Sequence, residues 1–124
     1  MKSISVAIIG ASHKPQRYAY QCQQMLMERD YPVFPVSGNG RDILGVKGYR
    51  SVSEIEQPVD TVTLYLNPQR HQPIKPEILA LKPRRIIFNP GTESDSLITE
   101  YEAHGIETLE ACTLVMLRTN QFES

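Results

Sequence analysis

Apolar and polar positions along the chain fall into blocks that predict strands separated by helices. Residues 3–9 form a nearly continuous apolar run that ends at Gly10, which is typical of a strand buried on both faces of a parallel sheet. A helix is expected at residues 18–29, where apolar side chains recur at helical spacing, and Pro32 prevents it from continuing. Its inward stripe consists of Ala19, Cys22 and Leu26.

The rest of the chain continues this alternation. Further strands are predicted at residues 33–36, 61–66, 85–88 and 107–109. Pro73 and Pro76 restrict the helix between the third and fourth strands to a late start near Pro76. Thr92 or Ser94 can cap the next helix, which ends at residue 104, before Gly105. Shorter helical segments are expected at residues 51–56 and 111–117.

Five strands separated by helices predict a parallel sheet with right-handed crossovers, because neighbouring parallel strands need a long connection. The expected fold class is therefore α/β: a doubly wound, Rossmann-like, five-stranded sheet in a single domain over residues 1–124. In such sheets, ligands bind beyond the carboxyl ends of the strands, where the strand order reverses. The residues that directly follow each strand are the first candidates for a site.

Composition excludes several classes of function. With 40% apolar residues but no long apolar stretch, the chain is not expected to contact a membrane, and its polar start does not resemble a signal peptide. A net charge of −1 with interspersed signs argues against nucleic-acid binding. Cys22 and Cys112 have no partners at metal-ligand spacing, so we expect two reduced, buried thiols and no metal. These features favour a cytoplasmic protein.

The turn after the first strand is the best candidate for an anion site. Gly10, Ala11 and Ser12 follow the buried strand, and a helix begins shortly afterwards. A glycine there lets backbone N–H groups approach an anion, to which the helix N-terminus adds its positive dipole end. Lys14 and Arg17 offer charge. A plain tight turn is the alternative, since the segment matches neither G-x-G-x-x-G nor the P-loop pattern.

The end of the second strand argues against NAD. A NAD-binding domain typically places Asp or Glu there to hold the ribose hydroxyls, whereas this chain has Pro35, Val36 and Ser37. Further along the same loop, Arg41 and Lys47 could meet an extra phosphate on the ribose. The alternative is that both are solvated loop charges.

Two asparagines follow the third and fourth strands at the same edge of the sheet. Asn67 precedes a proline, and Asn89 begins an Asn-Pro-Gly turn that ends at Gly91. Each side-chain amide could donate to a pyrophosphate or to a pantetheine amide. Asn-Pro is also an ordinary turn sequence, so turn formation remains the alternative.

These residues carry a resemblance to a known family. The chain resembles the small stand-alone CoA-binding domain proteins, which are similar to the nucleotide-binding domain of the succinyl-CoA synthetase alpha subunit. The resemblance runs over essentially the whole chain. The residues that carry it are Gly10-Ala11-Ser12, Lys14-Pro15, Arg17, Tyr20, Pro35-Val36, Ile43-Leu44-Gly45, Lys47, Tyr49, Pro58-Val59-Asp60, Pro90-Gly91 and Cys112.

The resemblance implies a coenzyme A site. Residues 10–12 would face the pyrophosphate, residues 35–37 the adenosine half, and the loop that contains Arg41 would lie near the ribose phosphate. The chain departs from the family at Ser37-Gly38, where an Asn-Pro pair is usual, and at Phe88-Asn89, where an aromatic-Gln pair is usual.

Three classes of function compete. The first is a binding module for CoA or an acyl-CoA that has no catalytic residues, acting alone, as a homo-oligomer or as an accessory subunit. The second is a small NAD(P)-dependent or acyl-CoA-using enzyme that completes its site by dimerising, with His13, His71 or Tyr20 as acid or base. The third is an interaction domain that has lost its ligand. The sequence favours the first class, because it shows no nucleophile–base pattern.

Overall fold

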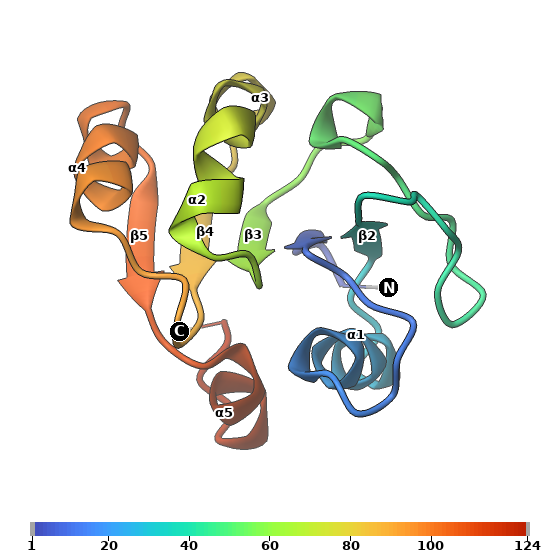
Figure 1. The fold of residues 1–124 in the computed structure, drawn as a ribbon. Helices are drawn as coiled ribbons and strands as arrows, with labels where there is room; N and C mark the ends of the chain where they lie inside the picture. The colour runs from blue at the N-terminus through green and yellow to red at the C-terminus, as the bar shows by residue number, and fades with distance from the viewer. Residues whose placement is uncertain (1, 124) are drawn as a thin grey trace.

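The computed structural model describes residues 2–123 and contains one five-stranded parallel sheet with the order β2-β1-β3-β4-β5 (Figure 1). The strands are β1 (Val6–Ile9), β2 (Val33–Val36), β3 (Thr61–Leu64), β4 (Arg85–Phe88) and β5 (Glu107–Glu110). Every residue of the three central strands is buried, which explains their continuous rather than alternating apolar pattern. The predicted doubly wound α/β fold is confirmed.

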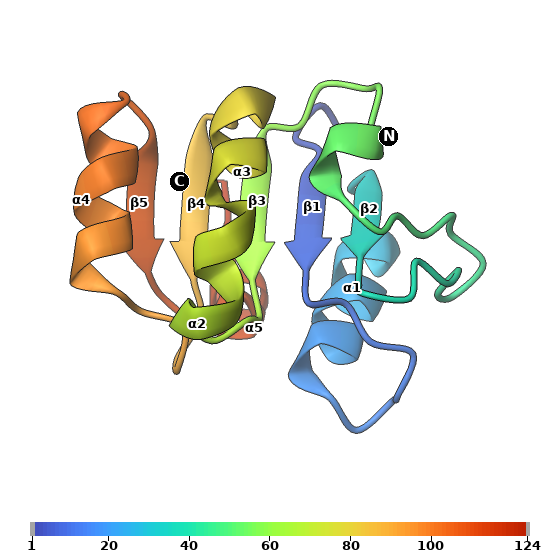
Figure 2. The same ribbon diagram turned by 45° about the horizontal axis from the view of Figure 1, so that its top comes forward.

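Helices cover both faces of the sheet (Figures 1 and 2). One face carries α1 (Tyr18–Glu28) and α5 (Thr113–Arg118). The other carries the short helix η1 (Val52–Glu54), α2 (Pro68–His71), η2 (Gln72–Ile74), α3 (Lys75–Leu81) and α4 (Asp95–Ala103). Among residues 2–123, no helix is long and apolar enough to cross a bilayer.

Each face of the sheet has its own core. Successive residues of β1 point to opposite faces, so Val6 and Ile8 join the core under α1 and α5, while Ala7 and Ile9 join the other. The α1 side of the first core consists of Ala19, Cys22 and Leu26, which confirms the predicted inward stripe. The second core is built mainly from Val62, Leu64, Ile78, Ile86, Phe88, Leu97 and Tyr101.

The chain reverses direction across the sheet between β1 and β3. The connection from β1 runs through α1 to β2 at one edge, whereas the connection from β3 runs through α2 and α3 to β4 on the opposite side. The two segments diverge beyond the carboxyl ends of β1 and β3, which is where a doubly wound sheet opens a crevice.

The helical segment before β4 differs from the prediction. The predicted helix with a late start near Pro76 is α3, which begins at Lys75, but the short helix α2 precedes it from Pro68 and was not predicted. Asn67 caps the first turn of α2, because the Asn67 Oδ1 accepts the Arg70 N–H at 2.9 Å. Pro68 is tolerated at the first helical position, because the backbone N–H that proline lacks would have no partner within the helix there. The 3₁₀ turn η2 accommodates Pro73 before α3 begins.

Element ends account for the remaining differences. The first and third strands are shorter than predicted, at residues 6–9 and 61–64, and the last helix spans 113–118 rather than 111–117. Ser94, not Thr92, caps α4: its Oγ accepts the Leu97 N–H, while the Thr92 hydroxyl donates to the Asn89 carbonyl. Gly105 follows α4 with a φ of 80°, as expected of a residue that ends a helix.

Candidate functional site

A cleft of about 530 Å³ opens at the carboxyl ends of β1, β2 and β3. Its base is the turn after β1, from Ile9 to Ser12, together with the start of α1. One wall is formed by residues 36–38 after β2 and by Arg50. The opposite wall is formed by Tyr65 and Leu66 after β3, with Arg70 and Ile74 above them. The cleft thus lies at the reversal of strand order, where the fold predicts a ligand.

Gly10 allows the segments that follow β1 and β3 to lie close together at the base of the cleft. Its φ is +88°, and a Cβ at this position would lie 3.0 Å from the backbone carbonyl of Tyr65 and 3.1 Å from Leu66 Cδ2. A larger residue would therefore strain the turn and collide with the β3 exit. The N–H groups of Gly10 and Ala11 both donate to the Val36 carbonyl, at 2.9 and 3.0 Å.

The backbone N–H groups that are free to bind a ligand belong to the residues that follow Ala11 in this turn. Among residues 2–123, the N–H groups of Ser12 and His13 have no acceptor, while the Ser12 Oγ accepts the Lys14 N–H at 3.1 Å and holds the turn in place. The N-terminus of α1 follows at Tyr18, with no side-chain cap and no acidic residue in its first turn. Its positive dipole end is therefore open to an anion.

Positive charge dominates the cleft. Lys14 and Arg17 lie at its base, Arg50 on one wall and Arg70 on the other. Within residues 2–123, none of these four side chains forms an ion pair, and no Asp or Glu lines the cleft. Unpaired charges of one sign in a cleft raise the local concentration of a ligand of the opposite sign. The arrangement is suited to a polyanion.

The comparison with known families agrees with this geometry. The profile of the CoA binding domain matches residues 4–118 of the chain. The protein belongs to the CoA-binding domain family. The match includes all five strands and every segment that lines the cleft.

Relatives of this CoA-binding domain include short and long chains. The uncharacterized protein YneT of Bacillus subtilis is 27% identical over 78 residues, which is 63% of this chain and 58% of YneT. The alpha subunit of an ADP-forming acetate–CoA ligase (II) of Pyrococcus furiosus is 39% identical over 56 residues, 44% of this chain but 12% of the subunit. The match thus spans less than two thirds of either relative.

Solved structures share the fold over their full length. An uncharacterized protein of known crystal structure superposes with a TM-score of 0.91 and 38% identity, covering 98% of this chain and 100% of the other. A conserved hypothetical protein of Pyrococcus furiosus gives a TM-score of 0.82 and 29% identity, covering 90% and 97%. Chains of this size therefore occur as separate proteins with this fold.

The CoA-binding domain brings most predicted site residues of its first half to the cleft. The residues that line it are Gly10, Ala11, Ser12, Lys14, Arg17, Val36 and Ser37. Pro35 lies outside it, buried in β2, where its carbonyl accepts the Tyr49 N–H. Because β2 is an edge strand of the sheet, a proline there is tolerated.

The predicted residues that follow β3 and β4 have structural roles. Asn89 is only 3% exposed, and its Nδ2 donates to the Thr63 Oγ1 and the Leu64 carbonyl, at 2.7 and 2.8 Å. Its Oδ1 accepts the Thr113 N–H at 2.9 Å, which fastens the start of α5 to β3. Asn67 caps α2, and Gly91 donates its N–H to Glu93. None of the three lines the cleft within the part of the chain that the structure describes.

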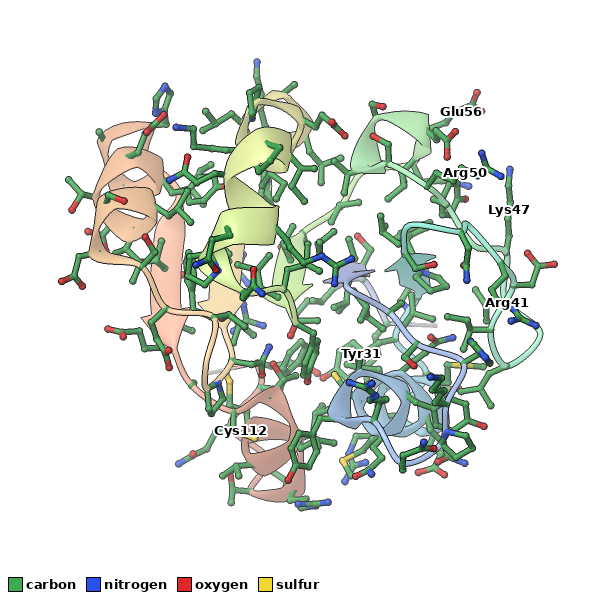
Figure 3. The ribbon with its side chains drawn as sticks, in the orientation of Figure 1. Tyr31, Arg41, Lys47, Arg50, Glu56 and Cys112 are labelled. Carbon is green, nitrogen blue, oxygen red and sulfur yellow. The ribbon has the colours of Figure 1, made fainter. Side chains whose placement is uncertain are left out.

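Arg41 also lies outside the cleft. Its Nη1 is 3.4 Å from the Nε2 of His13, on the exposed loop after β2. Figure 3 shows Arg41, Lys47 and Arg50 along this same connection, yet only Arg50 lines the cleft. Lys47 is placed over the ring of Tyr49, 5.1 Å from its centroid.

The lining residues that sequence reasoning missed are Ile9, Tyr18, Ala19, Gly38, Arg50, Tyr65, Leu66, Arg70 and Ile74. A correct start for α2 would have identified Arg70, because a helix that begins at Pro68 carries this residue at the β3 exit. Arg50 had no local signal in the sequence. The Tyr65 hydroxyl is buried and has no hydrogen-bond partner among residues 2–123, and burial beside the Cys22 thiol raises its pKa well above the ordinary range.

The candidate acid–base residues are placed away from the cleft. His71, the last residue of α2, is fully buried and stacked on Phe88, with its Nε2 2.7 Å from the Tyr101 hydroxyl. Burial, with a smaller effect of nearby Lys75, lowers the pKa of His71 to about 4. His13 and Tyr20 do not line the cleft.

Both cysteines are free thiols, as expected. Cys22 is fully buried, and burial raises its pKa to about 12, so it behaves as a small apolar side chain. Cys112, which precedes α5, is only partly buried, so the prediction of a second buried thiol is wrong (Figure 3). Within residues 2–123, no cluster of His, Cys, Asp and Glu could hold a metal ion.

Proposed function

We propose that this protein binds coenzyme A or an acyl-CoA in the cleft and performs no chemistry on it. One observation carries the proposal: four unpaired cations surround a cleft at the reversal of strand order, with no carboxylate among its described lining residues. Coenzyme A is a polyanion with a diphosphate and a separate 3′-phosphate, and membership of the CoA-binding domain family supports it as the ligand.

The diphosphate binds at the base of the cleft. The N–H group of Ser12, the open N-terminus of α1, and the side chains of Lys14 and Arg17 supply its donors. The adenosine half lies along residues 36–38, and the pantetheine arm passes toward Leu66 and Ile74, the apolar part of the opposite wall. Gly10 and Ala11 contribute the shape of the turn rather than amide donors, since their N–H groups are bonded to Val36.

A binding module without catalysis agrees with the positions of the reactive side chains. His71 and Cys22 are buried in the cores, and the low pKa of the first and the high pKa of the second keep both uncharged near neutral pH. The resemblance to part of an acetate–CoA ligase subunit supports a role in holding CoA for chemistry that another protein performs.

Thermal unfolding with matched ligands tests the proposal. Coenzyme A and acetyl-CoA should each raise the melting temperature, and a ligand at about 100 times its Kd stabilises the fold by about 2.7 kcal/mol. NADH has the adenosine diphosphate but neither the 3′-phosphate nor pantetheine, so at equal concentration it should raise the melting temperature far less. Acetyl-CoA should be recovered intact. A larger shift with NADH, or turnover of acetyl-CoA, would refute the proposal.

A further inference from the structure

Three cations lie on the connection between β2 and η1, and the structure separates them. Arg41 is near His13, Lys47 is over the Tyr49 ring, and Arg50 alone of the three lines the cleft beside Ser37 and Gly38. Sequence reasoning pointed to Arg41 as the partner of a ribose phosphate. The course of the loop explains why Arg50, and not Arg41, lines the cleft.

The first half of the loop is drawn away from the cleft. Ile43 is 2% exposed and packs into the core under α1, and its carbonyl accepts a hydrogen bond from the Gln23 Nε2 of α1 at 3.0 Å. A two-residue turn follows, closed by paired hydrogen bonds between Ile43 and Val46. Ile43 is therefore held against α1, and Arg41, two residues before it, lies beside His13 rather than in the lining of the cleft.

The second half of the loop returns along β2. Tyr49 pairs in parallel with Val36: the Tyr49 N–H donates to the Pro35 carbonyl at 2.9 Å, and the Ser37 N–H donates to the Tyr49 carbonyl at 3.0 Å. Tyr49 thus acts as a one-residue strand at the edge of the sheet. Arg50 follows Tyr49 as Ser37 follows Val36, so both leave the sheet at its carboxyl end.

The loop also makes room for the Arg50 side chain. A Cβ at Gly40 would lie 2.6 Å from the Arg50 Cγ and 3.4 Å from its Nε, and Gly40 has a φ of +65°. The Arg50 N–H donates to the Glu54 Oε1 at 2.9 Å, which fixes the backbone. Among residues 2–123, its guanidinium has no ion-pair partner. The backbone of Arg50 is therefore held in place, while its guanidinium stays available to a ligand.

We propose that Arg50 determines specificity for coenzyme A by binding its 3′-phosphate. The inference rests on the proposed function, in which the adenosine ribose lies beside residues 36–38. Lys14 and Arg17 are at the base of the cleft with the diphosphate, and Arg70 is on the far wall, so Arg50 is the cation beside the ribose. A guanidinium can bind two oxygens of a terminal phosphate at once. A diphosphate that is esterified at both ends has fewer free oxygens for such a bidentate contact.

Calorimetric titration of coenzyme A and dephospho-CoA tests this assignment. The wild-type protein should bind coenzyme A about 10- to 150-fold more tightly than dephospho-CoA, the range for one charge-assisted hydrogen-bonded contact. Arg50→Gln should remove that preference while leaving the affinity for dephospho-CoA unchanged. Arg50→Lys keeps the charge but loses the paired N–H donors of the guanidinium, so it should give an intermediate preference for coenzyme A over dephospho-CoA. Arg41→Gln is the matched control and should retain the wild-type preference.

The outcomes separate this inference from the proposed function. If the wild-type protein binds neither ligand, the proposed function fails, and the role of Arg50 fails with it. If it binds both ligands equally, or if Arg41→Gln removes the preference and Arg50→Gln does not, coenzyme A binding stands and the assignment to Arg50 is refuted. A folded Arg50→Gln variant that loses both ligands equally also refutes it, because Arg50 would then act on a shared part of the ligand.

Discussion

The two ends of the sheet hold basic residues in opposite ways. At the carboxyl end, Lys14, Arg17, Arg50 and Arg70 surround the cleft without ion-pair partners among residues 2–123. At the amino end, Arg84 Nε and Nη2 donate to the Asp60 carboxylate at 2.9 and 3.1 Å, and Arg84 Nη1 lies 3.5 Å from Glu107. The same residue type therefore supports the fold at one end and is left available at the other.

The hollows at the two ends differ in the same way. A second, more open hollow of about 640 Å³ lies at the amino end, and Asp60 lines it together with Lys82 and Arg84. Burial alone would raise the pKa of Asp60, but hydrogen bonds from Arg84 and Thr61 hold it below its usual range, so the carboxylate stays charged. A charged carboxylate repels phosphate. The cleft that we propose to bind a polyanion therefore differs from the amino-end hollow in two respects: it has no carboxylate among its described lining residues, and its arginines are unpaired, whereas Arg84 is paired with Asp60.

The sharpest test of this contrast removes two charges from the base of the cleft. The double variant Lys14→Gln/Arg17→Gln should weaken coenzyme A binding by about 100- to 20,000-fold, because two charge-assisted contacts are lost. Its melting temperature without ligand should not fall, since neither side chain has an ion-pair partner among the described residues. Calorimetry and thermal unfolding measure the two effects. The contrast fails if Arg84→Gln weakens binding equally.

Acidification should affect the two ends in different pH ranges. The pKa of His71 is about 4 in the fold and about 6.5 when unfolded, so the unfolded chain binds the proton first as pH falls. Stability should therefore drop by about 2 kcal/mol between pH values near 7 and near 5. The stabilising effect of Asp60 is present above its unfolded pKa of about 3.9 and is lost only below that value.

Denaturant unfolding as a function of pH measures this difference. The double variant His71→Phe/Tyr101→Phe keeps two aromatic rings in the core and has no titrating imidazole, so its stability should change less between neutral and mildly acidic pH. An equal change in both proteins would show that His71 is not responsible. Asp60→Asn should leave the loss near pH 5 intact, because Asp60 titrates at lower pH.

The smallest effect is expected at the amino end. Arg84→Gln should lower the free energy of unfolding by about 0.5–1 kcal/mol, because the side chain is half exposed and solvent screens its pairs with Asp60 and Glu107. Coenzyme A affinity should be unchanged. Denaturant titration of the free protein and calorimetry of the complex measure both quantities. A weakened affinity without a loss of stability would reverse the roles assigned to the two ends.

Sequence reasoning succeeded where the position of the cleft follows from local order along the chain. The buried apolar run before Gly10 indicated both the first strand and the turn that forms the base of the cleft. It failed where distant segments decide the outcome. Asn89 directly follows β4, a position at which a ligand-binding residue is expected, yet hydrogen bonds to β3 and α5 turn its side-chain amide inward. Arg50 reaches the cleft only because Tyr49 pairs with Val36, a contact between residues that no local pattern connects.

The way the loop after β2 is fastened has a consequence for engineering. Ile43 and Val46 close a turn whose two central residues, Leu44 and Gly45, have φ values of 53° and 76°. Ile43, Leu44 and Val46 pack against the core under α1 and Tyr49 pairs with β2, whereas Gly45 is exposed. Exposed loop tips of this kind tolerate inserted sequence. A short peptide tag or fluorophore placed between Leu44 and Gly45 would lie on the part of the loop that is drawn away from the cleft, so it would label the protein while leaving the wall of the proposed site intact.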